Sequence, residues 1–283
     1  MRILVTGATG QLGSAVCRIL AHETVIPKDL PDFDLSRSGV EEEILASRPE
    51  VIIHAGAYTD VDGAEREPEK ALAVNAKGTE QVAKAAAQLG AKLIYLSTDY
   101  VFDGAQHVPY REQDAPRPLN QYGLSKWRGE QAVLSSGARA LIVRTAWLYG
   151  RPGTNFVKSI MRAAQEQPVL KVVQDQRGCP THVDDLANAL AVLIHRDVDG
   201  ILHVTNRGDC TWHEFAEAIV QEMGLAIPVL PITTRQAGRL AQRPAYSVLN
   251  LDRLSSLGLA LPHWREALKQ FMSAQRFPLA ASK

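Results

Sequence analysis

The chain has 283 residues, of which 31 are Lys or Arg and 31 are Asp or Glu, so its formal net charge is zero. That length fits one large α/β domain, or one domain with a smaller companion. Because no block of like charge occurs, the sequence lacks the electrostatic signature of a nucleic-acid or membrane-surface binder, and the expected partner is a small molecule.

The cysteines and the N-terminus indicate a soluble cytoplasmic protein. Cys17, Cys179 and Cys210 are odd in number and far apart, so they offer neither a disulfide framework nor a Cys-x-x-Cys metal site. The apolar run after Met1 is too short for a signal peptide, and no apolar segment has the length of a transmembrane helix. We therefore expect no membrane partner and no resident metal.

The first half of the chain alternates short β-branched runs with longer segments of helical period. This alternation predicts a Rossmann-type, doubly wound parallel sheet with crossover helices. One helical segment, residues 69–89, contains a break at Gly78. The expected strands are residues 3–5, 24–26, 51–53, 92–96 and 140–143.

After Gly150 the pattern changes. A capping box at residues 211–214 predicts the start of a helix that Gly224 ends. We expect residues 1–150 to form the dinucleotide-binding core and residues 183–205 to return to it. Residues 151–182 and 206–283 would form a smaller, interleaved substrate-binding region. The expected elements there are helices at 155–165, 183–195 and near 264, and strands at 170–173 and 201–204.

A glycine-rich turn follows the first expected strand. Gly7, Gly10 and Gly13 stand where a helix begins, with Gln11 and Leu12 between them. Such a turn lets the backbone approach a pyrophosphate, although an ordinary strand-to-helix turn has the same glycines. Asp29, at the end of the second strand, is placed to accept hydrogen bonds from an adenosine ribose, which favours a dinucleotide.

Tyr122 precedes Lys126 by four residues, so both side chains lie on one face of a helix. An ammonium near the phenol would lower its pKa and fit it for proton transfer. Thr98, at the end of the fourth strand, can supply a further hydroxyl. Taken singly, Tyr122 could be an exposed helix residue and Thr98 a polar strand end.

Six motifs together resemble the dTDP-4-dehydrorhamnose reductase family of the extended short-chain dehydrogenases/reductases, over nearly the whole chain. The motifs at 97–104, 144–150 and 175–181 are more restricted than the others. The set comprises Gly-x-x-Gly-Gln-Leu-Gly at 7–13, Ser-Thr-Asp-Tyr-Val-Phe-Asp-Gly at 97–104, Tyr-Gly-x-Ser-Lys at 122–126, Arg-Thr-x-Trp-Leu-Tyr-Gly at 144–150, Asn-Phe-Val at 155–157 and Asp-Gln-x-Gly-x-Pro-Thr at 175–181.

The resemblance implies NAD(P)H-dependent reduction of the C4 ketone of a dTDP-linked keto-deoxy-sugar, giving dTDP-L-rhamnose for surface polysaccharide. It implies that Tyr122 protonates the ketone oxygen, Lys126 holds the nicotinamide ribose and Thr98 orients the carbonyl. Asp99 and Trp147 would contact the sugar, although Trp147 alone could equally be a core residue. The cofactor would be lined by Gly7, Gly10, Gln11, Leu12, Gly13, Asp29, Asp34, Leu35, Ala57, Tyr58, Thr59, Tyr122 and Lys126.

Some features depart from the family pattern or leave alternatives open. His54 and Gly56 replace the usual Asn and Ala, in a segment expected to act mainly through its backbone. Ala15 and Asp184 match a family Mg²⁺ site poorly, so a requirement for Mg²⁺ is doubtful.

Both NADH and NADPH are expected to serve as cofactor, with NADH equal to or better than NADPH. A homodimer is one assembly that the resemblance allows. Candidates for the diphosphate are Asn155, Arg177, Arg207 and Arg243.

Two alternatives to this activity remain open at the level of sequence. One is a reductase of another nucleotide-linked 4-keto-sugar. The other is a non-catalytic regulatory protein similar to the β subunit of methionine adenosyltransferase, in which loss of Tyr122 or Lys126 would be expected.

Overall fold

A six-stranded parallel sheet is the centre of the protein. The computed structural model describes residues 1–274. The strands are β1 (Arg2–Thr6), β2 (Thr24–Lys28), β3 (Val51–His54), β4 (Lys92–Thr98), β5 (Ala140–Thr145) and β10 (Gly200–His203). The strand order in the sheet is β10-β5-β4-β3-β1-β2. The chain adds β2 on one side of β1 and β3, β4, β5 and β10 on the other, so the topological switch point lies between β1 and β3. Ligands of such sheets bind at the carboxyl ends of the strands beside this point. The doubly wound fold and all five strands expected before Gly150 are confirmed.

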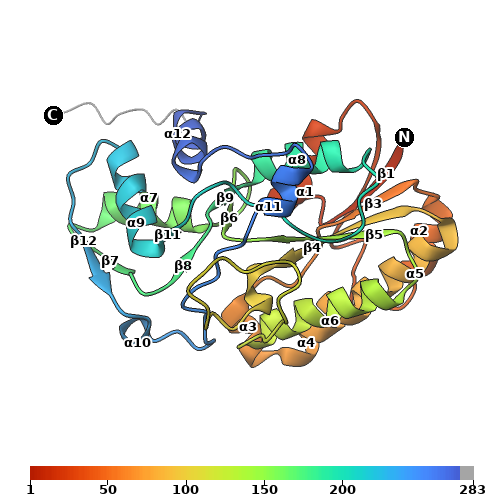
Figure 1. Cartoon of the computed structure of the whole chain (residues 1–283), viewed down its shortest axis with the longest axis horizontal. Helices are drawn as coiled ribbons and strands as arrows, with labels where there is room; N and C mark the ends of the chain where they lie inside the picture. Colours follow the sequence, from red (N-terminus) through yellow and green to blue (C-terminus); the bar gives the residue numbers. More distant parts are fainter. Residues whose placement is uncertain (275–283) are drawn as a thin grey trace.

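Helices cover both faces of this sheet, which explains why the inner strands β3 and β4 are buried along their whole length rather than at alternate residues. All seven residues of β4 are buried. Helices α1 (Gln11–Ile19) and α8 (Val183–Leu193) pack on one face, in a core that includes Val5 and Leu186. The other face carries α2 (Val40–Ser47), α5 (Thr79–Leu89) and α6 (Gln121–Ser135), as Figure 1 shows.

A smaller lobe lies beside the carboxyl edge of the sheet (Figure 1). Its own apolar core joins α7 (Phe156–Glu166), α9 (Trp212–Glu222) and α12 (Trp264–Ala274). Two short pairs complete it: β7 (Leu170–Val173) with β12 (Val229–Ile232), and β8 (Arg177–Gly178) with β11 (Cys210–Thr211). Thr211 and Glu214 form the predicted capping box of α9. The region expected to extend to residue 283 includes 275–283, which lie outside the described residues.

The chain returns from this lobe to the sheet at residues 183–203, and Leu254 of the later helix α11 (Asp252–Ser256) also packs in the core of the sheet. Strand β10 pairs with β5 in parallel as the sixth strand, and α8 packs against α1 beneath it. A parallel strand pair needs a crossover connection of this kind. The remaining small elements are β6 (Leu148–Tyr149), β9 (Thr181–His182) and α10 (Thr234–Ala237).

The segment expected as one helix with a break at Gly78 is three helical pieces in succession. They are α4 (Pro68–Leu72), a π-helical turn over Ala73–Gly78, and α5. The irregularity therefore precedes Gly78 rather than starting there. Single π-turns inside helices are frequent at functional sites, and this one contains Asn75, whose contacts are described below.

The side chain of His54 has a structural role, which corrects the expectation that its segment acts through the backbone. Its ring nitrogens lie 2.6 Å from Thr6 Oγ1 and 3.0 Å from Thr79 Oγ1, joining β1 to α5 through the core. Burial lowers the pKa of His54 to about 3, and the Lys126 charge acts in the same direction. The imidazole is therefore neutral.

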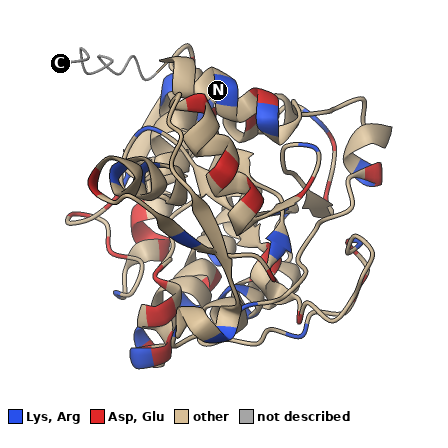
Figure 2. Cartoon of the chain, turned by 90° about the vertical axis from the view of Figure 1, so that its left-hand side faces the viewer, with Lys and Arg blue, Asp and Glu red and all other residues tan. Residues whose placement is uncertain are grey.

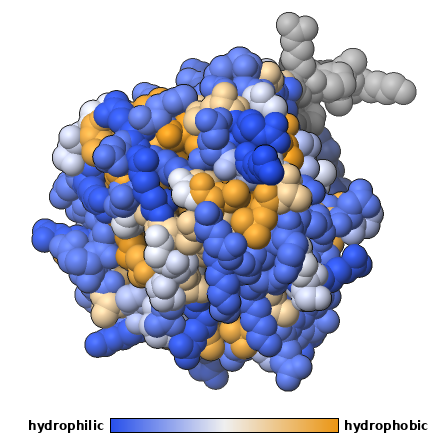
Figure 3. Space-filling model, turned by 90° about the vertical axis from the view of Figure 1, so that its right-hand side faces the viewer, coloured by the Kyte–Doolittle hydropathy of each residue, from blue (hydrophilic) through white to orange (hydrophobic). Residues whose placement is uncertain are grey.

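The surface agrees with the balanced composition. In the ribbon of Figure 2, acidic and basic residues are interspersed along the elements that face the viewer. On the face in Figure 3, apolar side chains form small groups separated by hydrophilic ones. Within residues 1–274, none of the helices combines the length and the apolar character that crossing a bilayer requires.

Candidate active site

A cleft of about 680 Å³ lies between the carboxyl edge of the sheet and the smaller lobe. Its walls come from segments that are far apart in the sequence, including the glycine-rich turn, the ends of β4 and β5, and helices α6, α7 and α9. The structure brings most of the residues expected at the site to this cleft. They are Gly7, Gly10, Gln11, Leu12, Gly13, Asp29, Ala57, Thr59, Thr98, Asp99, Tyr122, Lys126 and Trp147.

The glycine-rich turn forms an open cradle at the start of α1. Gly10 precedes the helix, and no side chain caps its N-terminus. A Cβ on Gly13 would lie 1.9 Å from the Gly7 carbonyl oxygen, so only glycine allows the turn to fold back on the helix this tightly. Uncapped N–H groups at a helix N-terminus are a binding site for an anion. The cradle therefore fits the pyrophosphate of a dinucleotide.

Asp29 stands at the rim of this cradle. Its Oδ2 accepts hydrogen bonds from Thr9 N (2.7 Å) and Thr9 Oγ1 (2.6 Å), and its Oδ1 accepts one from Leu30 N (2.9 Å). Lys28 turns away from it, with Nζ 3.3 Å from Glu43 Oε2, as strand alternation predicts. The carboxylate thus presents negative charge to the cleft without a cationic side chain beside it on β2.

Three residues expected to line the cofactor lie elsewhere, among those that the structure describes. Leu35 is a core residue, because its backbone and side chain fill the space beside Gly78. Asp34 bonds to Ser36 and pairs with Arg37 at 3.5 Å, which makes it a turn residue. The Tyr58 hydroxyl points to Glu67 (3.2 Å).

Asn75, which the sequence did not single out, joins the loop at 57–59 to α6. Its Oδ1 accepts from Tyr58 N (2.8 Å), and its Nδ2 donates to Tyr58 O (3.0 Å) and Ser125 Oγ (2.9 Å). Ser125 Oγ in turn donates to Tyr122 O (2.7 Å). In the sequence, the irregular helical pattern around Gly78 is the one feature that points to the neighbourhood of Asn75.

Tyr122 and Lys126 lie one turn apart on α6 and both face the cleft. Burial raises the pKa of Tyr122 to about 12; the Thr98 hydroxyl opposes that shift, and the Asp99 charge adds to it. The expected lowering by Lys126 is therefore wrong for this environment, since desolvation dominates. Burial likewise lowers the pKa of Lys126 to about 7, against the Glu130 charge. A phenol with this pKa stays protonated at neutral pH and can act as an acid.

Lys126 lies against the buried ring of Tyr95 and close to the buried Glu130–Arg144 ion pair. Its Nζ lies 4.3 Å from the centroid of the Tyr95 ring. One turn further along α6, Glu130 makes a two-point ion pair with Arg144 of β5 at 2.9 and 2.7 Å, and Ser97 Oγ donates to Glu130 Oε1 at 2.5 Å. Both charged side chains are buried. The pair fixes the face of α6 against the ends of β4 and β5.

Thr98 and Asp99 form a hydroxyl–carboxyl pair at the end of β4. Thr98 Oγ1 donates to Asp99 Oδ1 (3.1 Å), while Ser247 Oγ donates to Asp99 Oδ2 (2.5 Å). Burial raises the pKa of the Asp99 carboxyl to about 7, although both hydroxyl bonds oppose the shift. Ser247 lies 148 residues further along the chain, so no local pattern in the sequence indicates this contact.

This carboxyl predicts a pH dependence of stability. Its pKa is about 7 in the folded protein, above the ordinary 3.8, so the unfolded chain releases its proton first as pH rises. Stability should therefore fall between about pH 4 and 7, by at most about 1.4 kcal/mol per pH unit, and level off above that. Asp99→Asn should flatten this slope. Thermal melts of both proteins across the window test it, and parallel pH profiles would contradict it.

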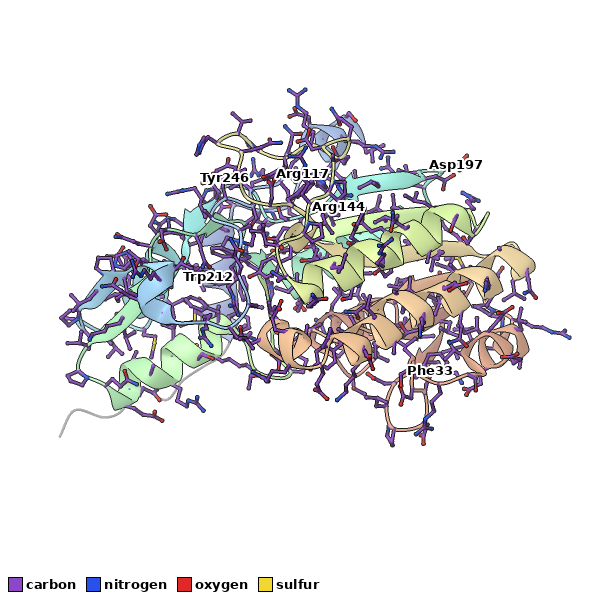
Figure 4. The ribbon with its side chains drawn as sticks, turned by 90° about the horizontal axis from the view of Figure 1, so that it is seen from below. Phe33, Arg117, Arg144, Asp197, Trp212 and Tyr246 are labelled. Carbon is purple, nitrogen blue, oxygen red and sulfur yellow. The ribbon has the colours of Figure 1, made fainter. Side chains whose placement is uncertain are left out.

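Trp147 forms an aromatic wall with the smaller lobe. Its ring stacks on Trp212 with centroids 3.4 Å apart and an angle of 5° between the planes. Its backbone φ is 48°, in the left-handed region, which bulky residues rarely adopt and which persists only where surrounding structure enforces it. Figure 4 shows Trp212 at the boundary between the smaller lobe and the sheet. Sequence reasoning missed Trp212, which looked only like the first residue of a capped helix.

Comparison with known proteins now decides the family. The RmlD substrate binding domain family matches residues 1–277. A dTDP-4-dehydrorhamnose reductase of Sinorhizobium fredii is 41% identical, with 97% of each chain covered. A dTDP-4-dehydrorhamnose reductase of Bacillus anthracis, whose crystal structure is a complex with NADP, is 42% identical with a TM-score of 0.93, covering 96% of this chain and 99% of that one.

The chain belongs to the dTDP-4-dehydrorhamnose reductase family. It is an NAD(P)H-dependent oxidoreductase with an extended short-chain dehydrogenase/reductase fold. A further relative, from Streptomyces antibioticus, bears the name probable dTDP-4,6-dihydroxy-2-methyloxan-3-one 4-ketoreductase. It is 41% identical, with 95% of this chain and 94% of the relative covered. The family therefore includes proteins named for more than one keto-sugar.

Of the four side chains considered for a diphosphate in this reductase, only Asn155 lines the cleft. Its Nδ2 donates to Gln11 Oε1 at 2.9 Å, which links the glycine-rich turn to the start of α7. The three arginines are engaged elsewhere. Arg177 pairs with Asp209 and Glu214, Arg207 donates to Leu261 O, and Arg243 pairs with Asp62.

The two positions compared with the Mg²⁺ site of other reductases in the family also have partners of their own. Asp184, at the start of α8, accepts a hydrogen bond from Arg18 Nη2 at 2.6 Å. Ala15, a residue of α1, is buried in the core and has no side-chain oxygen. Asp184 is thus already paired with a cation from the chain itself.

Proposed function

We propose that this protein reduces the C4 ketone of dTDP-4-dehydro-L-rhamnose to give dTDP-L-rhamnose. When bound, a reduced nicotinamide supplies the hydride that adds to the carbonyl carbon. The phenol of Tyr122 donates the proton that the carbonyl oxygen takes up, so the ketone becomes a secondary alcohol. The observation that carries this proposal is that half-buried Tyr122 and buried Lys126 line one cleft together with the glycine-rich cradle, and desolvation raises the pKa of the phenol to about 12.

The remaining residues of the cleft have complementary roles in this proposal. The cradle at residues 7–13, Asp29, Ala57 and Thr59 would hold the dinucleotide, with Lys126 at the nicotinamide ribose. Thr98 and Asp99 would orient the ketone, and Trp147 would contact the sugar. Because Trp147 meets the smaller lobe at Trp212, we infer that residues 151–182 and 206–274 serve as the substrate-binding region.

The direct test is oxidation of reduced nicotinamide by the purified protein in the presence of dTDP-4-dehydro-L-rhamnose. The product is then hydrolysed, and the free sugar is compared with authentic L-rhamnose and its C4 epimer. Release of rhamnose with stoichiometric cofactor oxidation supports the proposal. Release of the C4 epimer, or no oxidation at saturating substrate, overturns it.

A second candidate is reduction of a different dTDP-linked 4-keto-sugar. The Streptomyces antibioticus relative motivates it, since its 41% identity equals that of the Sinorhizobium fredii reductase. Specificity constants measured on the two keto-sugars side by side would separate the candidates, and the higher value identifies the substrate.

We expect the enzyme to use both cofactors, with NADH equal to or better than NADPH. Asp29 faces the cleft and would repel a 2′-phosphate, while Arg37, the nearest arginine after β2 in sequence, pairs with Asp34 at 3.5 Å. The Bacillus anthracis relative is in complex with NADP, which supports the NADPH part of this expectation. Specificity constants for the two cofactors on one keto-sugar are the test. A preference for NADPH above about tenfold, or roughly 1.4 kcal/mol, would contradict the expectation.

A further inference from the structure

A segment of the smaller lobe, residues 241–247, crosses the cofactor-binding half beside the active site; we call it the clasp. It follows α10 and runs toward α3 (Val61–Arg66), as Figure 1 shows. At one end, Arg243 Nη1 and Nη2 lie 3.2 and 3.0 Å from the two carboxylate oxygens of Asp62. Ala241 N also donates to Asp62 Oδ1 at 2.9 Å. At the other end is Ser247, which donates to Asp99.

Between these ends the clasp holds the start of the catalytic helix. Asn120 Nδ2 donates to the carbonyl oxygen of Gln242 at 2.8 Å. The same side chain caps α6, because its Oδ1 accepts from Gly123 N at 2.7 Å. Asn120 is buried, and Tyr122 is the second residue of the helix that it caps. A shift of the clasp would therefore displace the Asn120 cap, and with it the first turn of α6 that carries the Tyr122 phenol.

The fit at this end of α6 leaves little space. A Cβ on Gly123 would lie 2.1 Å from the Tyr100 carbonyl oxygen, so the helix and the turn after β4 are in direct contact. The Tyr100 ring meets the Tyr122 ring edge to face, with centroids 5.8 Å apart. The phenol is thus enclosed by Tyr100 on one side and by a cap tied to the clasp on the other.

We propose that Arg243 is a positioning residue: by pairing with Asp62 it fastens the clasp across the start of α6 and so holds Tyr122 in place for proton transfer. The inference rests on the proposed reduction. Arg243 is suited to this role because both its terminal nitrogens bind Asp62 and its side chain is only 15% exposed. Two-point arginine–carboxylate pairs fix geometry as well as supplying energy.

The alternative role for Arg243 is direct contact with the substrate's diphosphate. Breaking the pair by changing Asp62 should lower kcat if Arg243 fastens the clasp, and should leave substrate KM unchanged or lower it if Arg243 binds the diphosphate. The test uses Asp62→Asn, Arg243→Met and the double variant, with kcat, substrate KM and cofactor Kd measured for each. For the clasp we expect each single variant to lower kcat by about tenfold, because small displacements of a reacting group are costly. The double variant should be no worse than either single one, and cofactor Kd should change by less than about twofold.

The control is the exposed pair Arg139–Asp197, at 2.9 Å, with Arg139→Met expected to keep wild-type kinetics. A raised substrate KM in Arg243→Met with unchanged or lower KM in Asp62→Asn would assign Arg243 to the diphosphate and overturn the clasp. A lower melting temperature with wild-type kcat would also overturn it, since the pair would then be merely structural.

Hydrogen exchange of the Gly123 amide provides a measurement without substrate. We expect it to exchange about tenfold faster in both single variants and at the wild-type rate in Arg139→Met. If the wild-type protein fails to reduce a dTDP-keto-sugar, the proposed reaction fails, yet this exchange still decides the clasp. Unchanged exchange in both variants would overturn it.

Discussion

Replacing Tyr122 by Phe should lower kcat by about 10²- to 10⁴-fold, the usual contribution of general acid catalysis. The substitution removes only the hydroxyl, and the ring keeps its edge-to-face contact with Tyr100. Cofactor affinity should stay near the wild-type value, because the cradle and Asp29 lie on other elements. Steady-state kinetics on the keto-sugar, with parallel cofactor titrations, would measure both.

Tyr149→Phe is the matched control for this prediction. The Tyr149 hydroxyl is buried and has no hydrogen-bond partner among the described residues, and Tyr149 does not line the cleft described above. Its removal should leave turnover unchanged. If Tyr122→Phe turned over at the wild-type rate, the proton would have to come from another group, and the assignment of Tyr122 would be lost.

Replacing Trp147 by Ala should raise the substrate KM by about 30- to 100-fold, with a much smaller change in cofactor KM. The indole stacks on Trp212 and packs against Gly178, and it also lines the cleft, where it can contact a bound sugar. Aromatic anchors at binding sites commonly contribute about 2 kcal/mol or more, and a change of 30- to 100-fold in affinity corresponds to about 2.1–2.8 kcal/mol. Kinetics with each substrate varied in turn, recorded beside thermal melts, test this prediction.

Trp264→Ala is the matched control, because Trp264 is a tryptophan of the apolar core. Trp264 is buried in the smaller lobe, where its loss should cost about 3–5 kcal/mol of stability and leave substrate KM unchanged at temperatures where the variant is folded. If Trp147→Ala behaved in the same way, with a large fall in melting temperature and wild-type KM, Trp147 would be a packing residue of the lobe boundary.

The local elements were predictable because their signals are local. β-Branched runs bounded by polar residues form β1, β3, β4 and β5 where expected, since a strand buried on both faces must be continuously apolar. The glycine-rich turn and the four-residue spacing of Tyr122 and Lys126 likewise depend only on backbone geometry within one or two turns of helix. Together these two motifs predict a dinucleotide and a proton donor in one site, while the prediction of a keto-sugar reduction depended on the resemblance carried by the more restricted motifs.

What the sequence could not supply is the meeting of side chains from distant segments and the effect of burial on their charge. Asp34 and Leu35 follow the correct strand, yet the turn after it directs one to Ser36 and the other into the core. Lys126 was expected to lower the Tyr122 pKa, but enclosure by the surrounding elements raises it.

By itself, then, the sequence determined the fold class, the glycine-rich cradle and the Tyr122–Lys126 pair, because each is encoded within a short stretch of chain. Only the tertiary structure decided that Trp147 meets Trp212, that Ser247 binds Asp99, and that Arg243 pairs with Asp62 instead of standing free for a diphosphate. Those contacts depend on how the smaller lobe packs against the carboxyl edge of the sheet. That packing is set by the burial of many side chains at once, and no local motif encodes it.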